Sequence, residues 1–270
     1  MLTDYPSEYP CVIIRIQDQL FGVSAKIVKA MVAMPQVFSL PEKQQWVRGV
    51  INLRDEVHNL IDLRSRLGLK SYLVEISELI QMMEEREQDH RNWLLELENS
   101  VKEDREFTLA IDPHKCAFGK WRDNYEAKTF TIKHFLKKFD DPHQKIHDIA
   151  QEVISQKGEN GLESALAIIE STRQNELARM IDLFEEFRTM IQELTKLEIA
   201  LILDCKNTNC ALAVDSIESV EMLKEDSVEP VSRLLSNYDK TLVPLIGKRR
   251  TSDEIVLILD ENQLFTIMAE

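Results

Sequence analysis

Hydrophobic positions divide this chain into a strand-like first part, a helical middle part and a strand-like last part. In the first part, short apolar and β-branched runs alternate with polar turns, a pattern typical of strands. In the middle part, apolar residues recur every three or four positions, which predicts amphipathic helices, and in the last part a period of two returns. We therefore expect a split strand-rich domain, residues 1–70 and 199–270, that holds an inserted helical domain, residues 71–198.

Two long helices are predicted at the ends of this insert. Their apolar, heptad-like stripes run from Ile76 to Leu97 and from Leu177 to Leu194, and the opposite faces are strongly charged. Such stripes can recruit another protein, but each helix here has an obvious partner in the other. Between them we expect helices at 129–139 and from an acidic cap at Asp140-Asp141-Pro142 to a turn at 157–161.

The remaining predictions concern short elements of the strand-rich halves. The first half is expected to contain short helices at 25–34 and 64–67, the second ended by Gly68. The second half is expected to contain a hairpin turn at 206–209 and a short helix around Leu234. The predicted strands are 11–16, 20–23, 47–51, 199–203, 210–214, 217–223, 242–246 and 255–259.

Composition and charge exclude several classes of function. A net charge of −14 argues against non-specific binding to nucleic acid or anionic membranes, because both need basic surfaces. No apolar run has the length of a membrane-spanning helix, and residues 1–10 lack the apolar core of a signal peptide. Four cysteines without a dense framework fit a reducing compartment, so we expect a cytoplasmic protein with no direct membrane insertion. Two of them, Cys205 and Cys210, flank the predicted hairpin turn. They are either a redox pair or two small buried strand residues.

One set of residues in the insert carries candidate metal chemistry. His143 and His147 are four residues apart, which places both imidazoles on one face of a helix. With Cys116 and His90 they make a thiolate and three imidazoles, a complete tetrahedral set for zinc. His114, two residues from Cys116, is the main rival for one position, since spacing alone does not show which side chains converge.

Several short sequence motifs follow one another along the two strand-rich halves. They are Gly-Val-Ile-Asn-Leu-Arg at 49–54, Leu-Ile-Asp-Leu-Arg at 60–64, Leu-Gly at 67–68, and the segments 211–217, 229–230 and 255–260. In that order they resemble the CheW-like scaffold family of bacterial chemotaxis. The resemblance implies a pair of small five-stranded β-barrels without catalysis. The partners it implies are chemoreceptor signalling tips and a CheA-type histidine kinase.

Two departures from that family's pattern lie near Arg54, which stands at its receptor-contact position. Asp55 follows Arg54 where the family usually has glycine. Asn59 and Leu60 stand where a proline usually precedes the Ile-Asp-Leu sequence. The resemblance thus implies that Arg54 binds a partner. The two departures near Arg54 affect the receptor specificity that the resemblance would imply.

The insert also contains Cys-Ala-Phe-Gly-Lys-Trp at 116–121, His90 with Trp93 three residues on, and the His143/His147 pair. In this order they resemble the motifs of the chemoreceptor zinc-binding (CZB) domain, over about residues 85–170. The resemblance implies a zinc ion held by His90, Cys116, His143 and His147 in a small helical bundle. It also suggests sensing, through zinc occupancy or through oxidation of the zinc-bound thiolate.

We therefore expect an α+β protein, a split CheW-like double five-stranded β-barrel with an inserted α-helical zinc-binding bundle. Its expected function is a cytoplasmic scaffold that couples chemoreceptors to a CheA-type kinase and senses zinc or oxidants. Two alternatives stay open: an adaptor whose zinc is purely structural, and a zinc-dependent hydrolase. Four protein ligands leave no open position for catalysis, so no catalytic residue is expected. The sequence does not set the oligomeric state.

Overall fold

The computed structural model of the chain describes residues 10–41, 44–127, 129–205, 208–224, 227–231 and 241–264. The chain divides into two compact units, residues 1–75 with 193–270 and residues 76–192. The first, the strand unit, consists mainly of strands and the second, the helical unit, of helices, so the fold is α+β as expected. The domain boundaries expected at 70/71 and 198/199 stay a prediction.

The first sheet of the strand unit takes strands from both halves of the chain. Its order is β10-β11-β12-β2-β1-β9. β12 runs parallel to β2, with Leu257 opposite Phe21, and the other neighbours in this sheet are antiparallel. The strands are β1 (Pro10–Ile16), β2 (Gln19–Ser24), β9 (Ser216–Met222), β10 (Glu229–Pro230), β11 (Leu245–Lys248) and β12 (Ile255–Ile258).

The second sheet also joins the two halves, in the order β3-β7-β8-β6-β5-β4. β6 pairs with β8 in parallel, with Leu60 opposite Ala211, and β3 pairs antiparallel with β7. Because β6 precedes the insert and β8 follows it, neither half of the chain can complete this sheet alone. The strands are β3 (Val28–Ala33), β4 (Val37–Phe38), β5 (Val47–Leu53), β6 (Glu56–Asp62), β7 (Ile199–Cys205) and β8 (Thr208–Val214).

Each sheet has six strands among the described residues, where the family resemblance implied five. The difference lies in β4 and β10, which are two residues long and stand at one end of each strand order. Two residues carry no alternating signal, so a sequence cannot show such an edge strand. Side chains from both sheets share one core cluster, which includes Ile14 and Phe21 from the first sheet and Leu201 and Leu212 from the second.

Four predictions for short elements of this unit had different outcomes. The prediction of a helix at 25–34 is wrong, because Val28–Ala33 forms strand β3. This strand pairs with β7, and tertiary pairing of this kind overrides a weak helical spacing of apolar residues. The helix before Gly68 is confirmed as α1 (Leu63–Arg66), and Gly68 has a φ of 75°. Residues 206–207 of the expected turn and the helix around Leu234 lie outside the described residues, and α8 (Glu261–Leu264) is the last described element.

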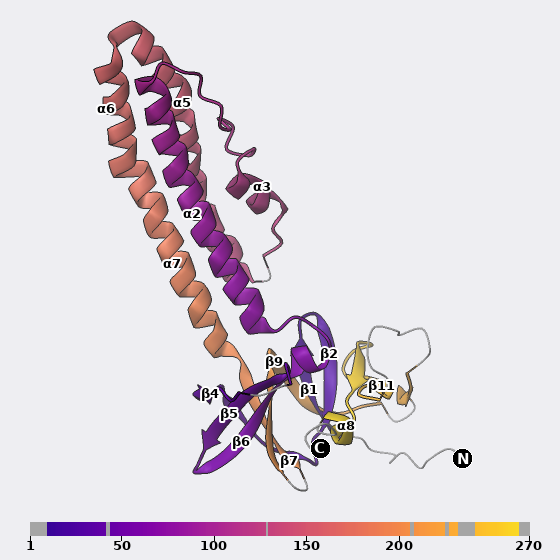
Figure 1. The fold of residues 1–270 in the computed structure, drawn as a ribbon. Coiled ribbons are helices and arrows are strands. Elements are labelled where there is room, and N and C mark those ends of the chain that lie inside the picture. The colour runs from indigo at the N-terminus through magenta and orange to yellow at the C-terminus, as the bar shows by residue number, and fades with distance from the viewer. Residues whose placement is uncertain are drawn as a thin grey trace. The chain divides into compact units, whose positions relative to one another are not determined.

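The helical unit contains the two long helices that the apolar stripes predict (Figure 1). Ion pairs join Glu87 to Arg188 and Glu98 to Arg173, which lies just before the second long helix. The partner of the later residue in the first helix therefore comes earlier in the chain. The two helices are therefore antiparallel. Met83 and Leu97 of the first stripe and Phe187 of the second are buried. The elements are α2 (Tyr72–Lys102), α3 (Ala117–Asn124), α4 (Phe130–Leu136), a 3₁₀ turn (Lys137–Phe139), α5 (Asp140–Asn160), α6 (Leu162–Thr172), a π-helical segment (Arg173–Leu177), α7 (Ala178–Leu194) and a second 3₁₀ turn (Thr195–Leu197).

Helix α5 begins without the predicted acidic cap and ends later than expected. The first 3₁₀ turn leads straight into α5, and Phe139 at the N-cap position makes no side-chain cap hydrogen bond. Asp140 and Asp141 lie instead in the first turn, where carboxylates favour the positive end of the helix. The chain leaves the helix only at Gly161, with a φ of 85°, and Gly158 lies inside it.

Candidate metal centre

Elements of the helical unit bring the four expected ligands together. α2 carries His90, α5 carries His143 and His147 on successive turns, and Cys116 directly precedes α3. One ligand atom from each residue lies within 4.8 Å of the others. The three imidazoles are buried, whereas Cys116 is partly exposed. That these four side chains bind a metal stays a prediction.

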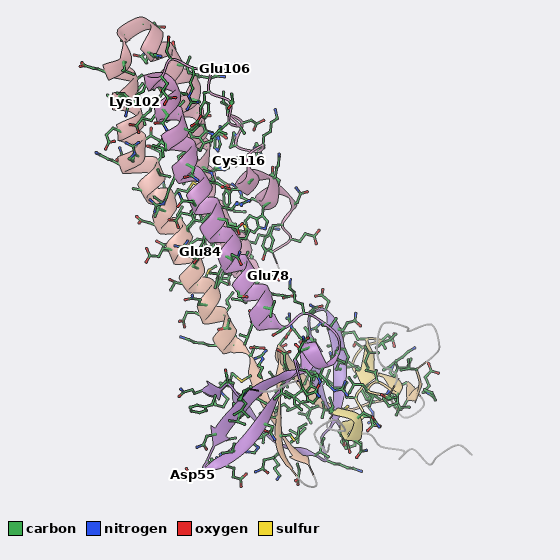
Figure 2. The ribbon with its side chains drawn as sticks, in the orientation of Figure 1. Asp55, Glu78, Glu84, Lys102, Glu106 and Cys116 are labelled. Carbon is green, nitrogen blue, oxygen red and sulfur yellow. The ribbon has the colours of Figure 1, made fainter. Side chains whose placement is uncertain are left out.

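The start of α3 places the sulfur of Cys116 (Figure 2). Cys116 is the N-cap residue of this helix, and its Sγ accepts a hydrogen bond from the backbone N–H of Gly119 at 3.2 Å. The turn is tight, because a Cβ on Gly119 would lie 1.9 Å from the carbonyl oxygen of Pro113. In this position Sγ lies 3.3 Å from Nε2 of His143. The glycine of the Cys-Ala-Phe-Gly-Lys-Trp sequence thus lets the sulfur reach the histidines.

Backbone carbonyls orient two of the histidines. Nδ1 of His90 lies 2.7 Å from the carbonyl oxygen of Arg86, and Nδ1 of His147 lies 3.1 Å from that of Ala110. Because a carbonyl oxygen only accepts, we infer that both Nδ1 atoms carry the proton, which leaves both Nε2 atoms as acceptors. Neither Nε2 atom has a hydrogen-bond partner among the described residues, although both are buried. Buried acceptors of this kind are costly unless a donor or a cation satisfies them.

The donor set fits zinc. A tetrahedral zinc ion with bonds of about 2.0 Å to nitrogen and 2.3 Å to sulfur holds its ligand atoms roughly 3.3–3.7 Å apart. The 3.3 Å between Sγ of Cys116 and Nε2 of His143 is within that range, and the 4.8 Å span of the whole set needs only small side-chain movements. If all four side chains bind one zinc ion, they complete a four-coordinate site and leave no open position for a substrate.

Burial favours the uncharged form of each side chain in the centre. It lowers the pKa of His90 and of His147 to about 4. It lowers the pKa of His143 to about 2, and the neighbouring histidines add to this effect. Burial also raises the pKa of the Cys116 thiol, against the backbone N–H groups at the start of α3 that favour the thiolate. Zinc binds neutral imidazole and thiolate, so binding at neutral pH requires the cysteine but not the histidines to lose a proton.

Aromatic side chains enclose the centre. Phe118 of α3 is fully buried, and its ring packs edge-on against that of His90. Trp93 packs against His147 and donates its Nε1–H to the carbonyl oxygen of Ala110 at 2.8 Å. The sequence motif includes Trp93 but not Ala110, whose carbonyl oxygen contacts both a candidate ligand and the neighbouring indole. A backbone carbonyl leaves no signal in a sequence.

A cleft of about 320 Å³ leads to the centre. Its lining includes Trp93, Lys115, Cys116 and His147. His90 also lines this cleft, and Cys116 is the least buried of the four candidate ligands.

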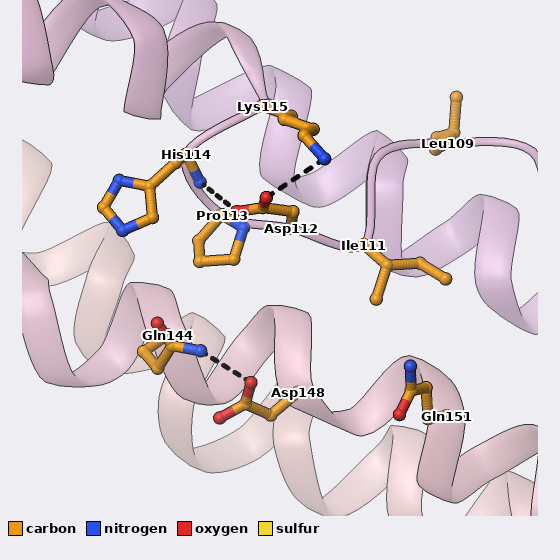
Figure 3. Close-up of a pocket in the computed structure, with 9 residues that line it drawn as sticks. All are labelled: Leu109, Ile111, Asp112, Pro113, His114, Lys115, Gln144, Asp148 and Gln151. Atoms are coloured by element: carbon orange, nitrogen blue, oxygen red, sulfur yellow. Dashed lines mark hydrogen bonds and ion pairs between the residues drawn. The ribbon is translucent and has the colours of Figure 1, made fainter.

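A second, polar cleft of about 660 Å³ shares Lys115 with the first (Figure 3). Its lining includes Asp112, His114, Gln144 and Asp148. His114, the rival ligand, is exposed, and its Nδ1 lies 2.8 Å from a carboxylate oxygen of Asp123. The structure does not bring His114 into the four-residue group.

The other predicted residues lie in the strand unit. Arg54 and Asp55 form the two-residue turn between β5 and β6, and Asp55 is labelled there in Figure 2. Arg64, from the CheW-like sequence 60–64, is buried and paired with Glu75 and Asp215. The proposed redox pair at the second hairpin lies outside the described side chains, because that of Cys205 is not described.

Comparison with protein families gives two matches. Residues 10–92 match the CheW-like domain, and residues 90–154 match the chemoreceptor zinc-binding domain. The chain carries a CheW-like domain and a CZB domain. Both resemblances inferred from the sequence are therefore confirmed. The four clustered side chains, from His90 to His147, all fall within the matched CZB domain.

Among solved structures, the scaffolding protein TtCheW from Thermoanaerobacter tengcongensis shares 14% identity, with 97% of this chain and 96% of that chain covered and a TM-score of 0.47. A likeness of that size carries no argument about this chain. A comparison with curated proteins finds no match. Among the described residues, no helix combines the length and the apolar character needed to cross a bilayer.

Proposed function

We propose that this chain is a cytoplasmic chemotaxis scaffold that also binds zinc. The CheW-like domain couples chemoreceptor signalling tips to a CheA-type histidine kinase, and the CZB domain holds one zinc ion through His90, Cys116, His143 and His147. The observation that carries the proposal is the thiol and three imidazoles gathered within 4.8 Å inside a CZB domain. The buried, unpartnered Nε2 atoms of His90 and His147 support it, because a metal ion would satisfy both.

The partial exposure of Cys116 supports a sensing role. Bound zinc holds the sulfur as a thiolate, the form that oxidants attack. The 320 Å³ cleft gives a small oxidant a path to this sulfur, while the three imidazoles are buried. The thiolate sulfur attacks one oxygen of hydrogen peroxide, the O–O bond breaks, and a sulfenic acid and hydroxide form, which weakens the metal site.

The two alternatives predict different results. If the zinc is purely structural, its removal lowers the thermal stability of the protein without changing partner binding or kinase control. A zinc-dependent hydrolase needs an open coordination position and a nearby base. Four protein ligands leave no such position, so we propose no catalytic role.

Zinc content tests the ligand set. We expect native mass spectrometry to find one zinc ion per chain in the wild-type protein and little or none in His147→Ala. His114→Ala is the matched control, because His114 is a nearby exposed histidine outside the group, and it is expected to keep the metal. Absence of zinc from the wild-type protein after metal-free purification and reloading would contradict the proposed zinc function.

Kinase control tests the sensing role. The kinase is assembled with receptors and with either wild-type protein or Cys116→Ser, and its autophosphorylation is measured before and after hydrogen peroxide is added. We expect peroxide to change the activity only with the wild-type protein. Unchanged zinc affinity and unchanged kinase control in Cys116→Ser would exclude sensing through this sulfur.

A separate variant tests the proposed binding to receptor tips. Arg54→Ala changes the turn of the β5–β6 hairpin and leaves the CZB domain untouched. We expect it to weaken binding to receptor tips while zinc content stays at one ion per chain. Unchanged receptor binding would remove Arg54 from the contact.

A further inference from the structure

A buried ion cluster in the strand unit includes the residue at which the chain returns from the helical insert. Arg48 of β5 donates from Nη1 and Nη2 to the two carboxylate oxygens of Glu198, each at 2.8 Å, and from Nε to Asp62 at 2.9 Å. The three side chains are 9%, 4% and 3% exposed. Glu198 directly precedes β7, so the guanidinium holds the end of the insert.

The same cluster includes the residue at which the insert begins. The carboxylate of Asp62 accepts hydrogen bonds from the hydroxyl of Ser71 at 2.6 Å and from the backbone N–H of Ser65 at 3.0 Å. Ser71 directly precedes α2. Burial acts to raise the pKa of Asp62, but Arg48 and these donors lower it below its usual range, so the carboxylate is charged at neutral pH. Ser71 and Glu198 thus bind the same arginine–aspartate pair.

A second cluster holds the first turn of α2. Nε and Nη2 of Arg64 donate to the two carboxylate oxygens of Asp215 at 2.7 and 2.5 Å, and Nη1 donates to Glu75 at 2.8 Å. The guanidinium also lies 5.0 Å from the ring centre of Tyr72. Tyr72 and Glu75 belong to the first turn of α2, and Asp215 lies between β8 and β9.

Buried charge clusters fix position better than they add stability. The cost of desolvating two charges roughly offsets their attraction, so well-packed apolar replacements are often neutral or stabilising. A two-bond arginine–carboxylate pair, by contrast, accepts one geometry. Arg48 and Asp62 stand near the base of the β5–β6 hairpin, where Val47 pairs with Ile61. The base of this hairpin is therefore held to both ends of the insert.

We propose that the Arg48 and Arg64 clusters form a positioning clamp. Through this clamp, zinc binding at the metal centre changes the base of the β5–β6 hairpin. The clamp rests on the proposed zinc binding. A change in α2 or α7 on zinc binding alters the placement of Ser71 and Glu198, and the Arg48 cluster passes that change to the hairpin base. Ser71 and Glu198 are positioning residues, outside the group of candidate ligands.

Hydrogen exchange of the full chain, measured by mass spectrometry with and without zinc, tests the clamp. In the wild-type protein we expect zinc to slow exchange several-fold in peptides that cover residues 47–62. Ser71→Ala and Glu198→Gln are each expected to abolish this zinc-dependent difference and to keep one zinc ion per chain. Ser71→Thr retains the hydroxyl and is expected to show the same zinc-dependent difference in hydrogen exchange as the wild-type protein.

Glu193→Gln is the matched control for Glu198→Gln. Glu193 lies at the same end of the insert, but its pair with Lys196, at 2.6 Å, is exposed. This variant is expected to keep the zinc-dependent difference. A wild-type protein that binds zinc without any change in hairpin exchange would overturn the clamp alone, as would a difference that survives in both Ser71→Ala and Glu198→Gln. Failure to bind zinc would overturn the proposed function, and the clamp with it.

Discussion

Gly119 is the residue on which the position of the candidate metal-binding sulfur depends most directly. A Cβ at this position would lie 1.9 Å from the carbonyl oxygen of Pro113, so Gly119→Ala must displace the turn that carries Cys116. We expect the variant to lose about 1–3 kcal/mol of stability without zinc. We also expect zinc affinity to fall at least about tenfold, as for other changes that disturb ligand placement. Urea denaturation and competition with a chromogenic chelator measure the two effects.

Gly158→Ala is the control for this substitution. Gly158 lies inside α5, and a Cβ there meets no atom of the described residues within 4 Å. Because alanine favours helix more than glycine does, we expect a gain of about 0.5–1 kcal/mol and unchanged zinc affinity. Equal zinc affinity in Gly119→Ala and the wild-type protein would show that the close contact does not position the sulfur.

The candidate ligands could be predicted from sequence because each belongs to a spaced motif. The histidine pair has helical spacing, and Cys116 has its glycine three residues on. The groups that position the ligands and those that hold the ends of the insert could not be predicted. The carbonyl oxygen of Ala110 has no side-chain signature, and Arg48 and Glu198 are separated by the whole insert. Either charged residue, taken alone, is typical of an exposed surface.

The β5–β6 hairpin is the element in which this chain departs from its family's sequence. Leu53 pairs with Glu56, so Arg54 and Asp55 form a two-residue turn, with φ angles of 53° and 67°. Both angles lie in the left-handed region, which glycine adopts without strain and aspartate tolerates better than most residues. We expect Asp55→Gly to raise the stability of the strand unit by up to about 1 kcal/mol, measured by urea denaturation.

The same substitution in the β1–β2 turn is the control. Ile16 pairs with Gln19, so Asp18 also lies in a two-residue turn, but its φ is not positive. Glycine there gains no relief from strain and adds freedom to the unfolded chain, so Asp18→Gly is expected to lower stability by about 0.5–1 kcal/mol. A loss of stability in both variants would mean that Asp55 is unstrained in its turn.

Long elements were predicted more reliably than short or irregular ones. A heptad stripe over α2 or α7 repeats its signal many times, whereas β3 carries apolar residues on both faces of a short run. The π-helical segment also lay beyond prediction. Thr172 and Leu177 are both buried although they are five residues apart, a step that the wider π turn accommodates. A single such step does not stand out against ordinary variation in spacing.

At the scale of the whole molecule, zinc is expected to stabilise one of the two units. A ligand that binds only the folded state adds about 2.7 kcal/mol when it is present at one hundred times its Kd. For a unit of the size of residues 76–192, this corresponds to a rise in Tm on the order of 10 °C. We expect calorimetry of the full chain to show that shift for the helical unit and a much smaller one for the strand unit.

Cys116→Ser separates this effect from general stabilisation by the metal salt. The variant loses one of the four proposed ligands, so its helical transition should move little when zinc is added. A shift as large as that of the wild-type protein would mean that zinc acts elsewhere in the chain.

The division into a split strand unit and a helical unit could be predicted because the period of the apolar residues changes twice along the chain. The pairing of the strands could not, because β6 meets β8 and β2 meets β12 across the insert. Alternation shows which face of a strand is buried and does not name its neighbour. The strands β4 and β10 are only two residues long, so they show no alternation of apolar and polar residues from which to predict a strand.

The parallel pairing of β6 with β8 sets an order of events during protein synthesis. A ribosome completes β6 well before β8, so the growing chain exposes an open strand edge, a site of wrong association. The helical unit emerges next. Once folded, it replaces the closure of a long flexible loop by a short, ordered connection, which lowers the entropic cost of bringing β8 to β6. If the helical unit binds zinc as proposed, cellular zinc supply at the time of translation is expected to affect the yield of the folded chain.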